Sequence, residues 1–347
     1  MTNTATQLTP DATGEQEAPL LEVQELGVEF STNRGVIRAL DNIGFTVNRG
    51  ETLAVLGESG SGKSVTAQAI MGLLPKHSAK ITDGAIRYEG TDLVTKPLKY
   101  VRELCGTDIA MIFQDPLSSL NPVFTVGYQI MESLRRRQGM KRHDARDYAL
   151  NLMERVGIPE PQRRFSQYPH QFSGGMRQRI MIAIALTLKP KLLIADEPTT
   201  ALDVTVQAQI MELLASIQEE TQMGMMLITH DLGVVADIAD RAVIMYSGRI
   251  AETGAIRDMY DNPAHPYTEG LLNSIPSDKE PGERLTPIAG SPPNLLNPPP
   301  GCRFAPRCPY AIDECVAAVP DLRVPEGWPA DQAAACIRTE EVMGNDQ

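Results

Sequence analysis

The sequence lacks any apolar run long enough to cross a bilayer, and it lacks an excess of basic residues. Its longest apolar stretch, IMIAIALTL at 180–188, is bracketed by Arg179 and Lys189 and falls short of the ~20 residues that a spanning helix needs. The 32 Lys and Arg against 44 Asp and Glu give a net charge of −12, which argues against nucleic acid as a partner. Any role at a membrane must therefore be carried out through partner subunits.

A signal peptide is also absent, because residues 1–19 have neither a basic start nor an apolar run. Their small polar residues predict a disordered lead-in, and we expect the chain to stay in the cytosol. The remaining sequence, 42% hydrophobic and 22% charged over the whole chain, is long enough for two or three structural units with an ordinary core. No internal repeat is present, so the main domain occurs once.

The stretch GESGSGKS at 57–64 follows the strand-like run TLAVL and precedes the helix-like segment VTAQAIMGLL. A strand, a glycine-rich loop and a helix in this order are typical of a phosphate-binding loop. Its backbone N–H groups can face an anion, Lys63 adds positive charge for the outer phosphates, and Ser64 can ligate Mg²⁺. The predicted ATP contacts in this loop are Gly57, Ser59, Gly60, Ser61, Gly62, Lys63 and Ser64.

Two carboxylates end the buried strand in LLIADEP, and they supply the chemistry that a phosphate loop needs. Asp196 is placed to hold the magnesium shell, and Glu197 to orient and deprotonate an attacking water. An acidic pair after an apolar strand is more often simply a solvated strand end. The prediction of a catalytic role therefore depends on the presence of the phosphate-binding loop in the same chain. Between the two motifs, Ser173, Gly174 and Gly175 of QFSGGMRQRI precede a helix whose N-terminus can bind an anion.

The order of these motifs, completed by Gln114 in IFQDP, by TALD and by His230 in ITHD, resembles that of the ATP-binding-cassette (ABC) ATPases. The resemblance implies an α/β fold with a P-loop, RecA-like nucleotide-binding domain over 20–265. It places a helical subdomain at about 117–180 and a small cysteine-rich extension at 266–347.

The same resemblance implies roles for residues that spacing alone does not assign. Gln114 senses the metal and links to the transport partner, and His230 contacts the γ-phosphate of ATP. Ser173, Gly174 and Gly175 close over the nucleotide of a second subunit, and Asp203 belongs to the loop that couples the two sites of a dimer. Phe30 stands where the family stacks an aromatic on adenine, although a buried strand aromatic is the alternative.

The stretches IFQDPLSSLNPVFTVGYQI at 112–130 and HPYTEGLLNSIP at 265–276 resemble the ATPase subunits of bacterial dipeptide and oligopeptide importers. That resemblance implies a peripheral protein on the cytoplasmic face of the cell membrane. Its partners would be a second ATPase subunit, two transmembrane permease subunits and, indirectly, an extracytoplasmic peptide-binding protein. Nickel, glutathione and opine importers are relatives, so the cargo stays open. A soluble ABC ATPase of DNA repair or translation, and a redox sensor with an attached ATPase, are the rival interpretations.

Four of the five cysteines lie in the last 46 residues, namely Cys302, Cys308, Cys315 and Cys336. A cytosolic compartment disfavours disulfides, which leaves metal as the main explanation for the clustering. No C-x₂₋₄-C pair typical of zinc is present, and spacing alone leaves an iron–sulfur cluster, zinc and unliganded cysteines open. The tail resembles those of peptide-importer ATPases that carry a [4Fe–4S] cluster, which implies these four cysteines as its ligands. Cys105 is expected to pack in the body.

Overall fold

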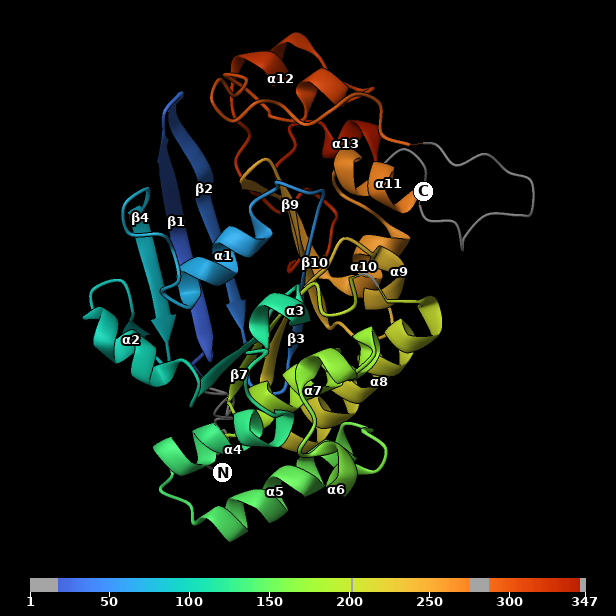
Figure 1. The fold of residues 1–347 in the computed structure, drawn as a ribbon. Helices are drawn as coiled ribbons and strands as arrows, with labels where there is room; N and C mark the ends of the chain where they lie inside the picture. Colours follow the sequence, from blue (N-terminus) through green and yellow to red (C-terminus); the bar gives the residue numbers. More distant parts are fainter. Residues whose placement is uncertain (1–17, 201, 275–286, 344–347) are drawn as a thin grey trace, which may run out of the picture.

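The computed structural model describes residues 18–200, 202–274 and 287–343, so most of the predicted N-terminal lead-in lies outside it. A seven-stranded sheet runs through the centre of the molecule (Figure 1) in the order β11-β10-β9-β3-β8-β7-β6. The five strands from β9 to β6 are parallel, and β10 and β11 run antiparallel to their neighbours. The strands are β3 (Thr52–Leu56), β6 (Ile109–Ile112), β7 (Leu192–Asp196), β8 (Gly224–Ile228), β9 (Arg241–Tyr246), β10 (Arg249–Ala255) and β11 (Ala333–Ala334).

The central strands are buried at every position because the sheet is covered on both faces. The sequence of a strand that is buried on both faces is continuously apolar and does not alternate between apolar and polar residues. TLAVL and LLIAD show this pattern. Successive residues of β3 enter opposite cores: Ala54 and Leu56 pack into one, Leu53 and Val55 into the other. This confirms the predicted α/β fold class.

A second, antiparallel sheet of order β2-β1-β4-β5 covers one side of the body together with α1 (Lys63–Ile70) and α2 (Leu98–Leu104). Its strands are β1 (Leu21–Thr32), β2 (Gly35–Val47), β4 (Ala79–Tyr88) and β5 (Thr91–Asp92). Apolar side chains of β1, β2 and β4 share one core with Leu53 and Val55 of the central sheet. The second sheet is thereby fixed against the helix that follows the predicted phosphate loop.

A helical insert separates β6 from β7, where the sequence predicted a helical subdomain at about 117–180 (Figure 1). In α4 the buried residues Val126, Ile130, Met131 and Leu134 follow helical spacing, whereas the last turn carries three basic residues. The insert consists of α3 (Pro116–Ser119), α4 (Val126–Arg137), α5 (Arg142–Arg155), α6 (Pro161–Arg164), a 3₁₀ turn (Pro169–Gln171) and α7 (Gly174–Leu186).

The cysteine-bearing tail is packed onto the end of the central sheet. Strand β11 pairs with β10, so the sheet continues across the boundary predicted at residue 265. The remaining helices are α8 (Val204–Thr221), α9 (Leu232–Val235), α10 (Ile256–Asp261), α11 (Pro266–Leu272), a 3₁₀ turn (Ala305–Arg307), α12 (Asp313–Ala317) and α13 (Thr339–Val342). Within the three described ranges, no helix has the length and apolar character needed to cross a membrane.

A fully buried carboxylate, Glu252 of β10, joins the tail to the body. It accepts hydrogen bonds from the backbone N–H groups of Ala264 (2.8 Å) and His265 (2.9 Å) and from Nε2 of Gln332 (2.8 Å). Burial raises the pKa of Glu252, and these bonds partly oppose that effect. The aromatic rings of Phe304, Tyr246 and Tyr267 also contact one another across the same junction. The tail is therefore built into the body.

Candidate nucleotide-binding site

The predicted site residues follow the carboxyl ends of four neighbouring parallel strands. The glycine-rich loop follows β3, Asp196 ends β7, Gln114 lies shortly after β6 and His230 shortly after β8. Because parallel strands end at the same edge of a sheet, the chain order of these motifs brings them together there, as in other open α/β sheets.

The loop at 57–62 needs glycine because of its backbone geometry. Gly57 has φ of 142°, and a Cβ there would lie 2.1 Å from the carbonyl oxygen of Met245. Gly62 has φ of 110°, and a Cβ there would lie 2.7 Å from Cδ2 of Leu40. Only glycine fits both positions without displacing β9 or β2. The Ser61 hydroxyl in the same loop is buried and has no hydrogen-bond partner in the described part of the chain.

Lys63 begins α1 and its side chain folds back over the loop. Its Nζ donates to the carbonyl oxygens of Gly57 (2.7 Å) and Glu58 (3.0 Å). Burial lowers the pKa of Lys63, while the carboxylates of Glu197, Asp196 and Glu58 act to raise it. The ammonium group therefore lies among three negative charges.

Ser64 and Asp196 lie side by side although 132 residues separate them. The Ser64 Oγ donates to Oδ1 of Asp196 at 3.1 Å. Burial raises the pKa of Asp196, and the bond from Ser64 partly opposes that effect. A hydroxyl and a carboxylate at the end of a phosphate loop are oxygen ligands of the kind that Mg²⁺ prefers.

Glu197 is held by three side chains from three different segments. It accepts bonds from Nε2 of Gln114 (2.8 Å) and Oγ1 of Thr200 (2.7 Å), and Nδ1 of His230 lies 3.4 Å from its other oxygen. Burial alone would raise its pKa, but Thr200, His230 and the Lys63 charge outweigh burial and lower it. The structure thus brings Gln114, Glu197 and His230 together, and it adds Thr200, which the sequence reasoning missed.

Ser173 and Asp203 cap two helices whose first turns lie side by side. Ser173 Oγ accepts from the N–H of Met176 (3.4 Å), and Asp203 accepts from the N–H of Val206 (3.0 Å). A Cβ at Gly174 would meet Leu202, and one at Gly175 would meet Val206. Ser173, Gly174 and Asp203 are exposed, so the two predicted motifs share one accessible surface.

Phe30 lies in β1, opposite Ile37 of β2 and Ala79 of β4. Its half-buried side chain packs against the core between the two sheets. This is the environment of a strand aromatic, and the adenine-stacking role stays a prediction.

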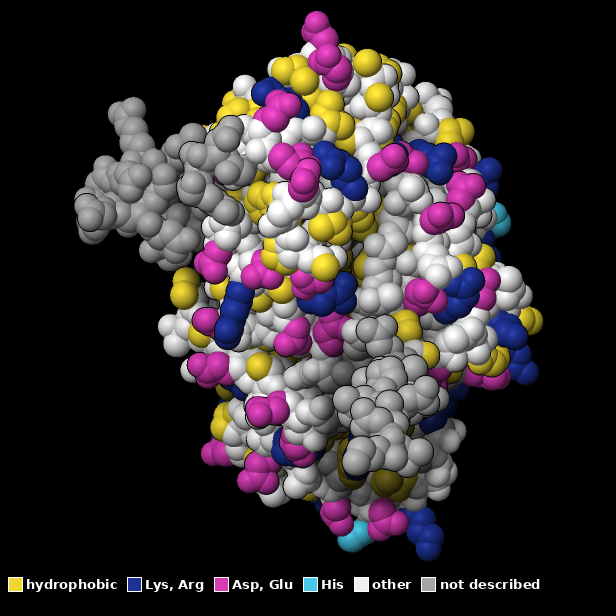
Figure 2. All heavy atoms as spheres, turned by 180° about the vertical axis from the view of Figure 1, so that it is seen from behind, with side chains coloured by type: hydrophobic (Ala, Val, Ile, Leu, Met, Phe, Trp, Pro, Cys, Tyr) yellow, Lys and Arg dark blue, Asp and Glu magenta, His cyan; other side chains and the backbone are white. Residues whose placement is uncertain are grey.

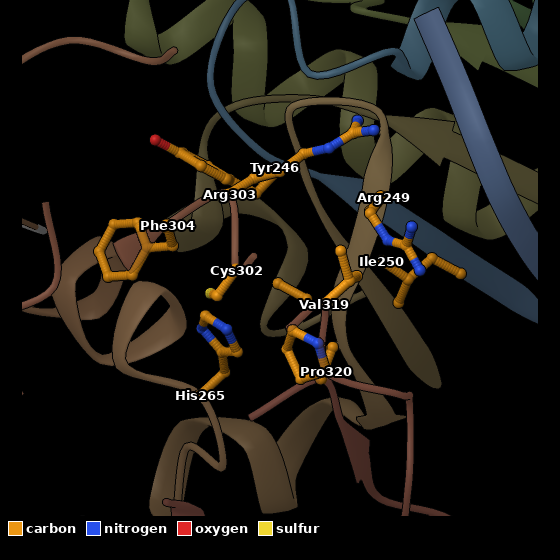
Figure 3. Close-up of a pocket in the computed structure, with 11 residues that line it drawn as sticks. Tyr246, Arg249, Ile250, His265, Cys302, Arg303, Phe304, Val319 and Pro320 are labelled. Carbon is orange, nitrogen blue, oxygen red and sulfur yellow. The ribbon is translucent and has the colours of Figure 1, made fainter. Parts of the chain in front are cut away.

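The four tail cysteines line one cavity together with His265, Phe304 and Tyr310. Cys302 and His265 also line a neighbouring cavity, where Figure 3 shows their side chains next to each other. Burial raises the pKa of Cys308 to about 11 and raises those of Cys302 and Cys336. Among the side chains that the structure describes, no group of three or more His, Cys, Asp or Glu is arranged to hold a metal ion.

Two parts of the chain match known protein families. Residues 40–200 match the ABC transporter family, and residues 251–315 match the C-terminal region of oligopeptide/dipeptide transporters. The chain is 52% identical over 321 residues to the dipeptide transport ATP-binding protein DppD of Bacillus subtilis, which covers 91% of this chain and 96% of that protein. The chain belongs to the ATP-binding proteins of ABC transporters. This ABC ATPase is also 51% identical over 326 residues to a putative peptide import ATP-binding protein of Brucella abortus, covering 94% and 98% of the two chains.

Solved structures of other cassettes share the fold of this ABC ATPase. The dimeric ATP-binding cassette MJ0796, in a post-hydrolysis state bound to ADP and Pi, matches with a TM-score of 0.62 and 27% identity over 68% of this chain and 99% of that one. CbiO1 of Clostridium perfringens, part of an ABC transporter complex, matches with a TM-score of 0.60 and 28% identity over 70% and 91% of the two chains. The predicted fold and the assignment as an ATPase are confirmed.

Proposed function

We propose that this ABC ATPase powers the import of di- or oligopeptides through two membrane permease subunits. The observation that carries the proposal is the match of residues 251–315 to the C-terminal region of oligopeptide/dipeptide transporters. The names of its relatives in Bacillus subtilis and Brucella abortus support the same cargo. We place the protein on the cytoplasmic face of the membrane, with an extracytoplasmic peptide-binding protein as an indirect partner.

The phosphates of ATP would bind to the loop at 57–64. The unpartnered Ser61 hydroxyl supports this site, because the donors of a phosphate cradle must face an anion rather than one another. Gly57 lets the loop curl closely against the Met245 carbonyl of β9. Lys63 would exchange its bonds to Gly57 and Glu58 for bonds to phosphate oxygens. The backbone at Ser59 and Gly60 is exposed at the open side of the loop.

Ser64 and Asp196, with Gln114 nearby, would hold Mg²⁺. Bound there, the ion would neutralise charge on the phosphate oxygens. The bond between Ser64 and Asp196 keeps both oxygens at one place, so the ligands are arranged before the ion arrives.

Glu197 is the best candidate for the base that activates water. Its lowered pKa keeps the carboxylate ionised at neutral pH, and the bonds from Gln114 and Thr200 fix the direction of its oxygens. His230 contacts Glu197 through Nδ1 and is 62% exposed at its side chain, so it would contact a γ-phosphate bound beside Glu197. Together these groups position water and donate to developing negative charge, which is most of what phosphoryl transfer requires.

A second ATPase subunit would complete each site. The exposed surface of Ser173, Gly174 and Asp203 offers backbone N–H groups and a helix N-terminus to a nucleotide on the partner. The dimeric MJ0796 cassette supports this arrangement. ATP binding would join the two subunits and hydrolysis would separate them, which gives the motion that drives transport.

The tail cysteines would hold a [4Fe–4S] cluster. All four line one cavity, as a cluster with one thiolate ligand at each corner requires. Iron and sulfide analysis of anaerobically purified protein tests the assignment. We expect about four irons per chain, lost in C308S and retained in C105S. Equal iron in both variants, or none in the wild type, would refute it.

Nucleic acid is not expected as a partner. On the face drawn in Figure 2, acidic and basic side chains are interspersed, and the coloured part shows no continuous basic field. This charge pattern does not favour the DNA-repair or translation ATPases as an alternative.

Uptake of a labelled dipeptide by cells that lack the gene tests the cargo. The wild-type gene should restore uptake, and a gene carrying Glu197→Gln should not, while uptake of a free amino acid stays equal in all strains. Restored uptake of nickel, glutathione or an opine, with no effect on dipeptides, would replace peptides by that cargo.

A further inference from the structure

Glu58, the second residue of the glycine-rich loop, is bonded at every polar group. Its backbone N–H donates to the hydroxyl of the fully buried Tyr267 (2.9 Å), and its carbonyl accepts from Lys63. Its carboxylate accepts two parallel bonds from Arg307, Nη1 to Oε2 at 2.6 Å and Nη2 to Oε1 at 3.0 Å. Two of its partners, Tyr267 and Arg307, lie beyond residue 265, in the predicted extension.

Arg307 is buried and held in place by the tail and the central sheet. Its side chain is 4% exposed, its Nε donates to the carbonyl of Ala289 (2.9 Å), and its Nη1 also approaches the hydroxyl of Tyr246 (3.2 Å). The guanidinium lies over the rings of Tyr246 and Phe304. A bidentate pair with so many fixed contacts has one geometry, so it fixes the Glu58 carboxylate.

The charge of Glu58 matters because it lies close to the proposed phosphate site. Its carboxylate is among the three that act on the Lys63 ammonium. Without Arg307, a partly buried negative charge would be left unpaired near the proposed triphosphate site, and such a charge is screened only weakly by salt.

We infer that Arg307 of the cysteine-bearing tail is a positioning residue for ATP binding, acting through Glu58. It holds the glycine-rich loop in its open curve and neutralises the one carboxylate within that loop. The inference rests on the proposed ATP site, and it requires neither peptide import nor the iron–sulfur cluster.

Titration of the full-length protein with a fluorescent ATP analogue and Mg²⁺, together with ATP hydrolysis kinetics, tests the role of Arg307. R307Q should raise the Kd and the KM about tenfold, or ~1.4 kcal/mol, with a much smaller change in kcat. Adding E58Q to R307Q removes the unpaired charge and should recover most of that loss. A role in packing alone would not be rescued in this way.

R323Q is the matched control, because Arg323 forms a bidentate pair with Glu340 inside the tail, away from the loop. The inference is overturned if R307Q binds ATP as R323Q does, or if the double variant binds as weakly as R307Q. K63A separates the two proposals: an unchanged Kd in K63A overturns the ATP site and this inference together. A loss in K63A with none in R307Q overturns the inference alone.

Should R307Q not fold, R307K keeps the charge and supplies a second test. Its Kd should stay within about threefold of the wild type, because neutralisation of Glu58 persists. A tenfold loss in soluble R307K that E58Q does not relieve would overturn the electrostatic role.

Discussion

Asp41 of β2 joins the tail to the body by charge, and replacing it with asparagine tests how the two are held together. Its Oδ2 accepts from Arg303 of the tail (2.6 Å) and from Arg249 of β10 (2.7 Å), and its Oδ1 lies 2.9 Å from Nε of Arg38. Arg303 and Asp41 are 8% and 15% exposed at their side chains. Asp41→Asn leaves three guanidinium groups without their shared counter-charge.

Breaking a buried ion pair from one side costs about 3–5 kcal/mol. Arg38 and Arg249 are 42% and 24% exposed, so water takes over part of the lost interaction, and we expect ~3 kcal/mol for D41N. R303M should cost less, ~2 kcal/mol, because Asp41 keeps two partners. R323M, which breaks an exposed pair within the tail, should cost at most ~1 kcal/mol.

Trp328 is the single tryptophan of the chain and lies in the tail, so its fluorescence reports the tail while circular dichroism reports the whole protein. In the wild type, both urea transitions should coincide. In D41N the Trp328 fluorescence should change at a lower urea concentration than the circular dichroism. A loss of ~3 kcal/mol corresponds to a difference of about 1 M or more between the two midpoints. If the two transitions of D41N coincide, and their midpoint equals that of R323M, the reasoning that the Asp41 ion cluster holds the tail against the body is refuted.

Three further predictions concern single side chains. Glu252→Ala leaves the buried N–H groups of Ala264 and His265 without an acceptor and removes one of the two acceptors of Gln332 Nε2. It should lower stability by ~3–5 kcal/mol, measured by thermal unfolding against the milder E252Q. Gly57→Ala places a methyl group against the Met245 carbonyl and should abolish binding of a fluorescent ATP analogue, whereas G60A, whose Cβ meets nothing within 4 Å, should bind more strongly than G57A. Thr200→Val removes a donor to Glu197 and should lower ATP turnover about tenfold at unchanged Kd, whereas equal turnover would show that Thr200 does not orient the carboxylate.

The parts of the site that form contiguous motifs could be predicted from the sequence. A strand, a loop and a helix adjacent in the chain fix the glycine-rich loop at 57–64, and buried parallel strands carry Asp196 and His230 to the same sheet edge. The contact between Gln114 and Glu197 follows from the same rule, because each lies just after a strand and those strands pair directly.

The contacts of the tail could not be predicted in this way. Arg303 pairs with Asp41 across 262 residues and Arg307 with Glu58 across 249, and neither pair leaves a local pattern. A two-residue strand such as β11 is also too short for periodicity to show. One signal was available: in CRFAPRC, each arginine stands next to a cysteine, an unusual place for two charges that turn out to be buried.

The most direct test of the account is ATP hydrolysis by the purified protein carrying Glu197→Gln. Glutamine keeps the shape of the side chain and loses the base, so turnover should fall by roughly 10²–10⁴-fold while MgATP still binds and the bound protein stays dimeric. Turnover is measured as phosphate release, and nucleotide binding is measured with a fluorescent ATP analogue on the same sample. Turnover equal to that of the wild type would contradict the assignment of Glu197 as the base.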